Sequence, residues 1–293
     1  MKLQTIALHP VFAAEVTGVD LSAPLSAGTV QAIHDGMNQH AVLLFRNQRL
    51  TEQDQMRVGE SLGTVESQPA SVGQGNGRLQ DARMNDISNL GPDGELLPEQ
   101  HARRLFNLGN RLWHTDSSFK ALPSKYSLLY GKRIPSAGGD TEFADMRAAY
   151  DGLDEQWRAE IDSLIAHHSL LYSRALLGFD QFSDQERERY TPVRQRLVRR
   201  HPGSARLSLY LAAHIGAVEG MSRPEAMMLV HDLIEHATRP EWVYRHQWQT
   251  DDLIIWDNRC TMHRATRYPE KNEVRDMRRV TIEDDCNTLE QPR

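Results

Sequence analysis

Residues 242–256 read WVYRHQWQTDDLIIW, and this stretch decides the predicted fold class. From Trp242 to Trp248 every second side chain is aromatic or an imidazole, the period-two pattern of a strand with one buried face. Residues 250–252 suit a turn, and the LIIW run after them is typical of a fully buried strand. The pattern predicts a β-hairpin whose second strand is buried.

Both helices and further strands are predicted on either side of this stretch. The expected helices share apolar residues at helical spacing or a capping pair at the first turn, as in Ser222 with Glu225. Together with a strand-rich second half, they indicate an α+β fold around a β-sandwich or barrel. The expected helices are residues 26–40, 51–63, 153–164 and 222–239, and the expected strands include 41–45 and 274–282.

The region between residues 68 and 100 is rich in Gly, Asn, Asp and Pro, which favours a long loop with a brief strand at 86–90. Long loops in compact domains are often lids over a site. Neither a linker nor an internal repeat divides the chain. We expect a single domain over residues 1–293, with an active-site lid around 68–104.

Composition narrows the functional class. The formal net charge of −6 argues against nucleic acid as a partner, and no apolar run is long enough to span a bilayer, so we expect no membrane association. The N-terminus lacks the pattern of a secretory signal. Cys260 and Cys286 are too few for a disulfide framework, so free thiols and a cytoplasmic location are expected.

A histidine and an aspartate two residues apart are the first metal-binding candidates. If residues 114–116 form an extended strand, His114 and Asp116 point to the same face and can chelate one ion. Two histidines with one carboxylate form the ligand set of non-haem Fe(II) oxygenases. The pair alone is weak evidence because the chain contains 13 histidines. The sequence around the pair is therefore needed to judge whether His114 and Asp116 bind a metal.

Four blocks supply that context: WHTD at 113–116, GGDTEF at 138–143, WDNRCTMHRA at 256–265 and RDMRRVTI at 275–282. In this order they resemble the family of taurine dioxygenase and 2,4-dichlorophenoxyacetate dioxygenase, especially its aryloxyacetate branch. The resemblance implies a double-stranded β-helix (jelly-roll) core with flanking α-helices. It also implies that His114, Asp116 and His263 bind Fe(II), with 2-oxoglutarate and O2 as co-substrates. Asp257 and Asn258 suit a structural turn before His263.

The same resemblance implies two anion-binding arginines. Arg275, helped by Thr141, is matched to the distal carboxylate of 2-oxoglutarate, for which a guanidinium fork is well suited. Arg279 lies four residues on, on the same face of an expected strand, and is matched to the acidic group of the substrate. The spacing from His263 to Arg275 is one residue longer than in taurine dioxygenase, which leaves the exchanged arginine assignment open.

The substrate pocket follows from the same resemblance. Asn110, expected on the strand of His114, and His214 are matched to it, and residues 68–104 and 170–182 are expected to line its aryl part. We expect a dioxygenase that acts on a small acidic substrate, with an aryloxyalkanoate cleaved to a phenol and glyoxylate as the favoured class. A sulfonate, an alkyl sulfate or another small carboxylate is the alternative.

Two other classes of protein remain open at this point. A metal-dependent sensor would use the same β-scaffold without catalysis, and a zinc hydrolase would use His114, Asp116 and His263 but leave the inward arginines unexplained. We further expect a homo-oligomer, either a dimer or a tetramer.

Overall fold

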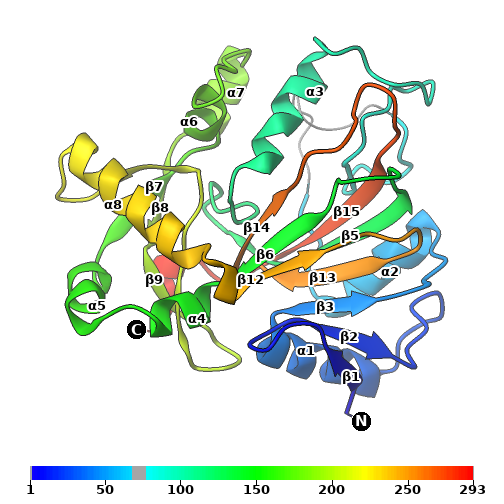
Figure 1. Ribbon diagram of the computed structural model, residues 1–293, viewed down its shortest axis with the longest axis horizontal. Helices are drawn as coiled ribbons and strands as arrows, with labels where there is room; N and C mark the ends of the chain where they lie inside the picture. The colour runs from blue at the N-terminus through cyan, green and yellow to red at the C-terminus, as the bar shows by residue number, and fades with distance from the viewer. Residues whose placement is uncertain (1, 68–76, 293) are drawn as a thin grey trace.

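The computed structural model describes residues 2–67 and 77–292, and its largest element is a seven-stranded sheet (Figure 1). Neighbouring strands are antiparallel except for β2 and β3, which are parallel. β13 lies between β3 and β5, so both of its edges are hydrogen-bonded. In spatial order the strands are β1 (Gln4–Ala7), β2 (Ala14–Thr17), β3 (Val42–Phe45), β13 (Leu253–Asp257), β5 (Ser124–Arg133), β15 (Asp276–Glu283) and β4 (Asn85–Asp86).

Smaller antiparallel sheets pair the other strands of the described residues. The sheet β12–β6–β14 lies against the large sheet and carries one of the expected metal ligands on β14. The remaining two sheets are β11–β7–β8 and β10–β9. Their bounds are β12 (Val243–His246), β6 (Thr141–Asp145), β14 (Thr261–Ala265), β11 (Ile215–Val218), β7 (Ile165–His168), β8 (Val193–Arg196), β10 (Leu207–Leu209) and β9 (Val198–Arg200).

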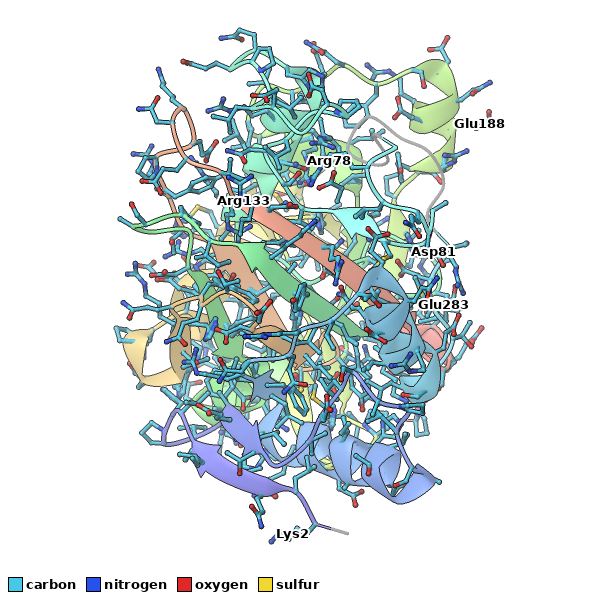
Figure 2. All side chains as sticks on the ribbon, turned by 90° about the vertical axis from the view of Figure 1, so that its right-hand side faces the viewer. Lys2, Arg78, Asp81, Arg133, Glu188 and Glu283 are labelled. Carbon is cyan, nitrogen blue, oxygen red and sulfur yellow. The ribbon has the colours of Figure 1, made fainter. Side chains whose placement is uncertain are left out.

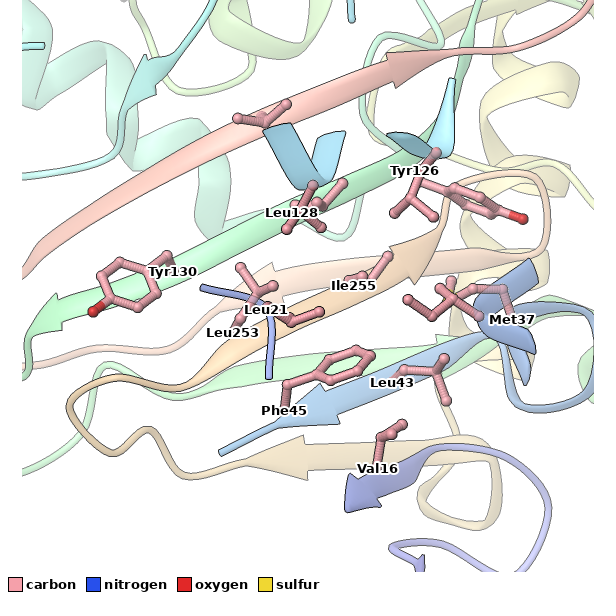
Figure 3. Close-up of a cluster of buried hydrophobic side chains, with 14 of the residues drawn as sticks. Val16, Leu21, Met37, Leu43, Phe45, Tyr126, Leu128, Tyr130, Leu253 and Ile255 are labelled. Carbon is pink, nitrogen blue, oxygen red and sulfur yellow. The ribbon is translucent and has the colours of Figure 1, made fainter. Parts of the chain in front are cut away.

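The LIIW run is apolar throughout because β13 is buried on both faces. Leu253 and Ile255 pack into a cluster with apolar side chains of α1 and α2, as Figure 3 shows for part of this cluster. Ile254 and Trp256 point to the other face, where they pack with Phe143 of β6. The two sheets therefore share an apolar interior beneath the site.

Helices cover the outer faces of the sheets. α1 and α2 pack on the large sheet, and Figure 2 shows α2 lying across the Glu283 end of β15. α3, α6 and α7 stand at one end of the molecule, whereas α4, α5 and α8 lie beside the smaller sheets (Figure 1). Their bounds are α1 (Ala27–His40), α2 (Glu52–Leu62), α3 (Ala102–Asn107), α4 (Met146–Asp151), α5 (Glu155–Ile161), α6 (Leu170–Ala175), α7 (Asp184–Arg189) and α8 (Arg223–Ala237), with short 3-10 helices η1 (Leu108–Arg111), η2 (Pro240–Trp242) and η3 (Thr288–Glu290).

Most of the expected elements are confirmed. Ser26 caps α1, and α2 begins with a capping box of Thr51 and Asp54. α8 begins with a capping box of Ser222 and Glu225. The α+β class is therefore confirmed in its coarse form, as antiparallel sheets with helices packed outside.

The predicted hairpin over residues 242–256 is wrong. β12 pairs with β6, whereas β13 pairs with β3 and β5 in the other sheet. A period-two pattern shows that a strand has one buried face but does not specify its partner. The chain therefore crosses from one sheet to the other between Trp248 and Leu253.

Three smaller expectations also need correction. Residues 114–116 are not a strand: His114 forms one isolated bridge, and Asp116 lies in a turn. Asn110 lies in η1 and not on an extended segment with His114. The expected strand at 86–90 is reduced to the two residues of β4, and residues 68–76 of the expected lid lie outside the described residues.

No helix within residues 2–67 and 77–292 combines the length and the apolar character required to cross a membrane.

Candidate active site

Two backbone hydrogen bonds bring His114 and His263 together. The amide of His114 donates to the carbonyl oxygen of His263 at 3.0 Å, and the amide of His263 donates to the carbonyl oxygen of His114 at 2.8 Å. His263 lies on β14, whose other edge pairs with β6. The two imidazole centroids are consequently 4.2 Å apart.

The carboxylate of Asp116 completes a compact set of three donors. Its Oδ1 lies 3.8 Å from Nε2 of His114, and its Oδ2 lies 3.8 Å from Nε2 of His263. The three donor atoms fall within 4.8 Å of one another, and all three residues are buried. Asp116 was expected to lie beside His114 because both would be on one strand. In the structure a turn brings its carboxylate to the two histidines instead.

This donor set fits a divalent metal ion. Nδ1 of His114 hydrogen-bonds to the carbonyl oxygen of Leu112 at 2.7 Å, which leaves Nε2 free to bind a metal. Two imidazoles and one carboxylate suit a borderline first-row ion and leave other coordination positions for ligands. The arrangement could hold one metal ion.

The protonation states also suit a metal. Burial lowers the pKa of His114 and holds the pKa of His263 well below its ordinary value, so both imidazoles are neutral near pH 7. Burial alone would raise the pKa of Asp116, but the positive charge of Arg279 and the hydrogen bond from Ser127 help to lower it to about 2. The carboxylate is therefore ionised throughout the neutral range.

Ser127 and Asn258 hold Asp116 in place, and the sequence did not reveal this role. The Ser127 hydroxyl donates to Oδ2 of Asp116 at 2.7 Å and accepts a hydrogen bond from Nδ2 of Asn258 at 2.9 Å. Oδ1 of Asn258 accepts hydrogen bonds from the Asp116 amide at 3.2 Å and from Nε1 of Trp256 at 3.0 Å. The only sequence signal was the position of Asn258 inside the WDNR block, which had indicated a turn.

A cavity that is partly open to solvent adjoins the donor set. Its wall includes residues of the β14–β15 connection, of η1 and of the expected lid, for example Tyr268, Leu108 and Asn89. Six of the sequence-predicted site residues line this cavity, whereas Asp116 and His214 are not among its lining residues. The six are Asn110, His114, Thr141, His263, Arg275 and Arg279.

Arg275 is a buried cation in this cavity with no carboxylate partner in the described part of the chain. Its Nε donates to the carbonyl oxygen of Gly139 at 3.2 Å. Burial lowers the pKa of Arg275 to about 10, which still leaves it charged at neutral pH. Thr141 lies on the same wall, and its hydroxyl accepts a hydrogen bond from Nε1 of Trp248 at 3.0 Å.

Arg279 is held differently. Its Nη1 donates to Oδ1 of Asp116 at 2.5 Å, whereas its Nε is buried without a hydrogen bond. Arg278, the residue before it, points the other way, and its Nε donates to Oε1 of Gln55 in α2 at 2.8 Å. His214 is buried and packs edge-on against His114, with ring centroids 6.0 Å apart.

Comparison with known proteins identifies the family. The chain matches the family described as taurine catabolism dioxygenase TauD, TfdA family, over residues 4–281, and it belongs to this family. The resemblance found in the sequence is thereby confirmed.

Individual relatives cover nearly the whole chain. It is 42% identical to an alpha-ketoglutarate-dependent 2,4-dichlorophenoxyacetate dioxygenase of Cupriavidus pinatubonensis, over 95% of this chain and 97% of the relative. It is 33% identical to an alkylsulfatase of Acinetobacter baylyi, over 98% of this chain and 87% of the relative. The crystal structure of AAD-2 in complex with Mn(II) and N-oxalylglycine has 46% identity and a TM-score of 0.92, covering 99% of this chain and 100% of that chain.

The hydrogen-bond network around Asp116 predicts a measurable effect on metal binding. Ser127→Ala removes a hydroxyl that orients the carboxylate, so the Kd for Mn(II) should rise about 10-fold in a calorimetric titration. The control is Ser61→Ala, because that hydroxyl bonds only within α2, to the carbonyl oxygen of Val58. An unchanged Kd in Ser127→Ala would show that the network does not support the metal site.

Proposed function

We propose that this protein is an Fe(II)- and 2-oxoglutarate-dependent dioxygenase that hydroxylates a small acidic substrate, with aryloxyalkanoates as the favoured class. One observation carries the proposal: a buried set of two histidines and one carboxylate shares a cavity with the unpaired cation of Arg275. A zinc hydrolase would leave that cation unexplained. The alpha-ketoglutarate dependence of the Cupriavidus relative supports the same chemistry.

His114, Asp116 and His263 would hold the iron. When bound, iron(II) with 2-oxoglutarate and O2 supplies the oxidant for a substrate C–H bond, and 2-oxoglutarate leaves as succinate and CO2. The contribution of the chain is to keep both imidazoles neutral and the carboxylate ionised, in one fixed arrangement. The hydrogen bond of Ser127 to Asp116 serves this purpose.

Arg275 would bind the distal carboxylate of 2-oxoglutarate, with Thr141 beside it. The guanidinium lies in the cavity and forms no salt bridge with a carboxylate of the described residues. An arginine fork matches a carboxylate through two parallel hydrogen bonds. Gly139 belongs to this site, because its carbonyl oxygen fixes Nε of Arg275. The remaining guanidinium nitrogens are then available for the ligand.

The favoured substrate class follows from the relatives and from the charge of the cavity. Hydroxylation of the carbon between an aryl ether oxygen and a carboxylate gives a hemiacetal, which collapses to a phenol and glyoxylate. Arg279, Asn110 and His214 are proposed to bind or orient this substrate. Orientation matters because it decides which C–H bond faces the oxidant.

An alkyl sulfate or a sulfonate is the second candidate substrate. The 33% identity to an alkylsulfatase supports it, since that relative covers 98% of this chain. A guanidinium binds sulfate and carboxylate oxygens by the same charge-assisted hydrogen bonds. The two candidates therefore differ in the body of the substrate more than in its anionic end.

We further propose that the sheets form one double-stranded β-helix within a single domain of residues 1–293, with a lid around 68–104. Ile87, Asn89 and Arg104 on the cavity wall support the lid. The homo-oligomer remains a prediction, as does the absence of nucleic acid and membrane partners. The free thiols of Cys260 and Cys286 are compatible with the proposed cytoplasmic location.

The role of Arg275 can be tested with Arg275→Lys. Lysine keeps the charge but loses the fork, so the KM for 2-oxoglutarate should rise about 10-fold or more, while the KM for the organic substrate changes little. Steady-state succinate formation measures both constants. The reverse pattern would mean that Arg275 and Arg279 have exchanged roles.

A substrate panel tests the proposed function itself. Aryloxyacetates, 2-aryloxypropionates, taurine and alkyl sulfates are compared for stimulation of O2 uptake in the presence of Fe(II) and 2-oxoglutarate. We expect an aryloxy acid to give the largest stimulation. Failure of every aryloxy acid would remove the favoured class, and a response confined to alkyl sulfates or taurine would establish the second candidate.

A further inference from the structure

Asn89 holds together several segments of the cavity wall through its side chain and its backbone. Its Nδ2 donates to the carbonyl oxygens of Glu273 at 2.8 Å and Glu270 at 3.3 Å, and its Oδ1 accepts a hydrogen bond from the amide of Arg275 at 3.0 Å. Its own amide donates to the carbonyl oxygen of Arg275 at 3.2 Å, and its carbonyl oxygen accepts from the amide of Leu97 at 2.9 Å. One residue therefore fixes the peptide groups on both sides of Arg275.

The position of Arg275 in the chain explains why this support matters. Arg275 directly precedes β15, and the pairing of β15 with β5 begins at Asp276, where the register is already irregular. On the other edge of β15, the amides of Ile87 and Asn89 donate to the carbonyl oxygens of Met277 and Arg275, which continues the pairing beyond β4. The backbone of Arg275 is thus attached to the segment of Asn89 and lies outside the ladder with β5.

Gly139 holds the other end of the Arg275 side chain. Nε of Arg275 donates to the carbonyl oxygen of Gly139 at 3.2 Å. Gly139 has a φ of +72°, and a Cβ at this position would lie 3.4 Å from both Cδ and Nε of Arg275. Glycine therefore lets the backbone approach the guanidinium closely. With the peptide groups fixed by Asn89 and Nε fixed by Gly139, the direction of the guanidinium is set from both ends.

Asn89 lines the cavity but has no side-chain donor left for an anion. The residue is only 5% exposed. An asparagine side chain carries one NH2 group with two hydrogens, and Nδ2 of Asn89 already donates to two carbonyl oxygens. Any effect of this side chain on an acidic ligand therefore has to pass through Arg275.

We propose that Asn89 is a positioning residue for Arg275, which it holds in the orientation that binds the distal carboxylate of 2-oxoglutarate. The proposal rests on the proposed function, because it takes Arg275 as the partner of that carboxylate. Two parallel hydrogen bonds from a guanidinium depend on its orientation as well as its charge. Removing the Asn89 side chain leaves the charge in place but frees the peptide groups of Arg275 to move.

A general loosening of the cavity wall is the alternative effect of such a change. The carbonyl groups that Asn89 binds belong to the β14–β15 connection, which also contributes Tyr268 and Glu270 to the wall. A loosened wall weakens the binding of every ligand in the cavity, whereas a displaced Arg275 weakens only ligands that carry the distal carboxylate. Two ligands that differ in this group therefore distinguish the two effects.

The test measures calorimetric binding to the Mn(II)-loaded protein for the wild type and for Asn89→Ala. The 2-oxoglutarate analogue N-oxalylglycine carries a distal carboxylate, whereas oxalate has only the metal-binding end. In the variant the Kd of N-oxalylglycine should rise about 10-fold, the equivalent of one lost hydrogen bond, while the Kd of oxalate stays within 2-fold. In turnover the KM for 2-oxoglutarate should rise and the KM for the organic substrate should not.

A double-mutant cycle tests whether Asn89 acts through Arg275. Arg275→Gln removes the guanidinium, so adding Asn89→Ala to it should raise the Kd of N-oxalylglycine by less than a further 2-fold. A further 10-fold increase would mean that the two residues act independently.

The matched control is Gln48→Ala. Gln48 makes the same kinds of side-chain bonds to the backbone: its Oε1 accepts from the amide of Leu21 at 2.8 Å, and its Nε2 donates to the carbonyl oxygens of Arg46 at 2.9 Å and Val19 at 3.2 Å. These four residues are not among those that line the cavity. Loss of this clamp should lower the temperature of thermal unfolding and leave both Kd values unchanged.

Three results would overturn the proposal: an unchanged Kd of N-oxalylglycine in Asn89→Ala, equal increases for N-oxalylglycine and oxalate, or independent effects in the cycle. If Asn89→Ala does not fold, Asn89→Gln decides by the same comparison, since it keeps the amide group but displaces it by one methylene. Failure of the proposed function shows without any change at Asn89. In that case the wild type releases no succinate with any acid, or Arg275→Gln leaves the Kd of N-oxalylglycine unchanged.

Discussion

The reciprocal backbone hydrogen bonds between His114 and His263 are the constraint on which the rest of the site depends. They attach a chain segment without regular strand structure to β14 and bring together two ligands that are 149 residues apart in the sequence. The turn after His114 then places Asp116 between the imidazoles. β14 itself is held by β6, whose Phe143 packs on the buried β13, so the apolar interior supports the segment that carries His263, a proposed metal ligand.

The site contains more buried positive charge than its carboxylates neutralise, and this excess favours the binding of anions. Asp116 is paired with Arg279, whereas Arg275 and Arg174 are buried without acids among the described residues. Buried cations of this kind lower stability until an anion arrives, so binding an acidic ligand recovers part of that cost. In the proposed function, the distal carboxylate of 2-oxoglutarate would neutralise Arg275. The neutral imidazoles of His114 and His263 complete a site that attracts anions while remaining able to hold a metal.

The sequence predicted the positions of helices and strands better than it predicted which strands pair with each other. The LIIW run was correctly assigned to a buried strand because its side chains are apolar on both faces, but its pairing with β12 could not follow from periodicity. The three proposed metal donors were predicted from recognisable blocks, and the structure brings them together. The contacts of Ser127 and Asn258 with Asp116 were not predictable, because they join segments that are distant in the sequence and leave no characteristic spacing. Asn110 was placed near the cavity correctly, although on the wrong element, since η1 replaced the expected strand.

A crystal structure with Mn(II) and N-oxalylglycine, an inert analogue of 2-oxoglutarate, tests the central claim most directly. We predict one metal ion bonded to Nε2 of His114, Nε2 of His263 and a carboxylate oxygen of Asp116, with the distal carboxylate of the analogue on Arg275. Metal bound instead at the buried cluster of His201, Asp257 and Cys260 would contradict the account. So would an analogue whose distal carboxylate is held by Arg279.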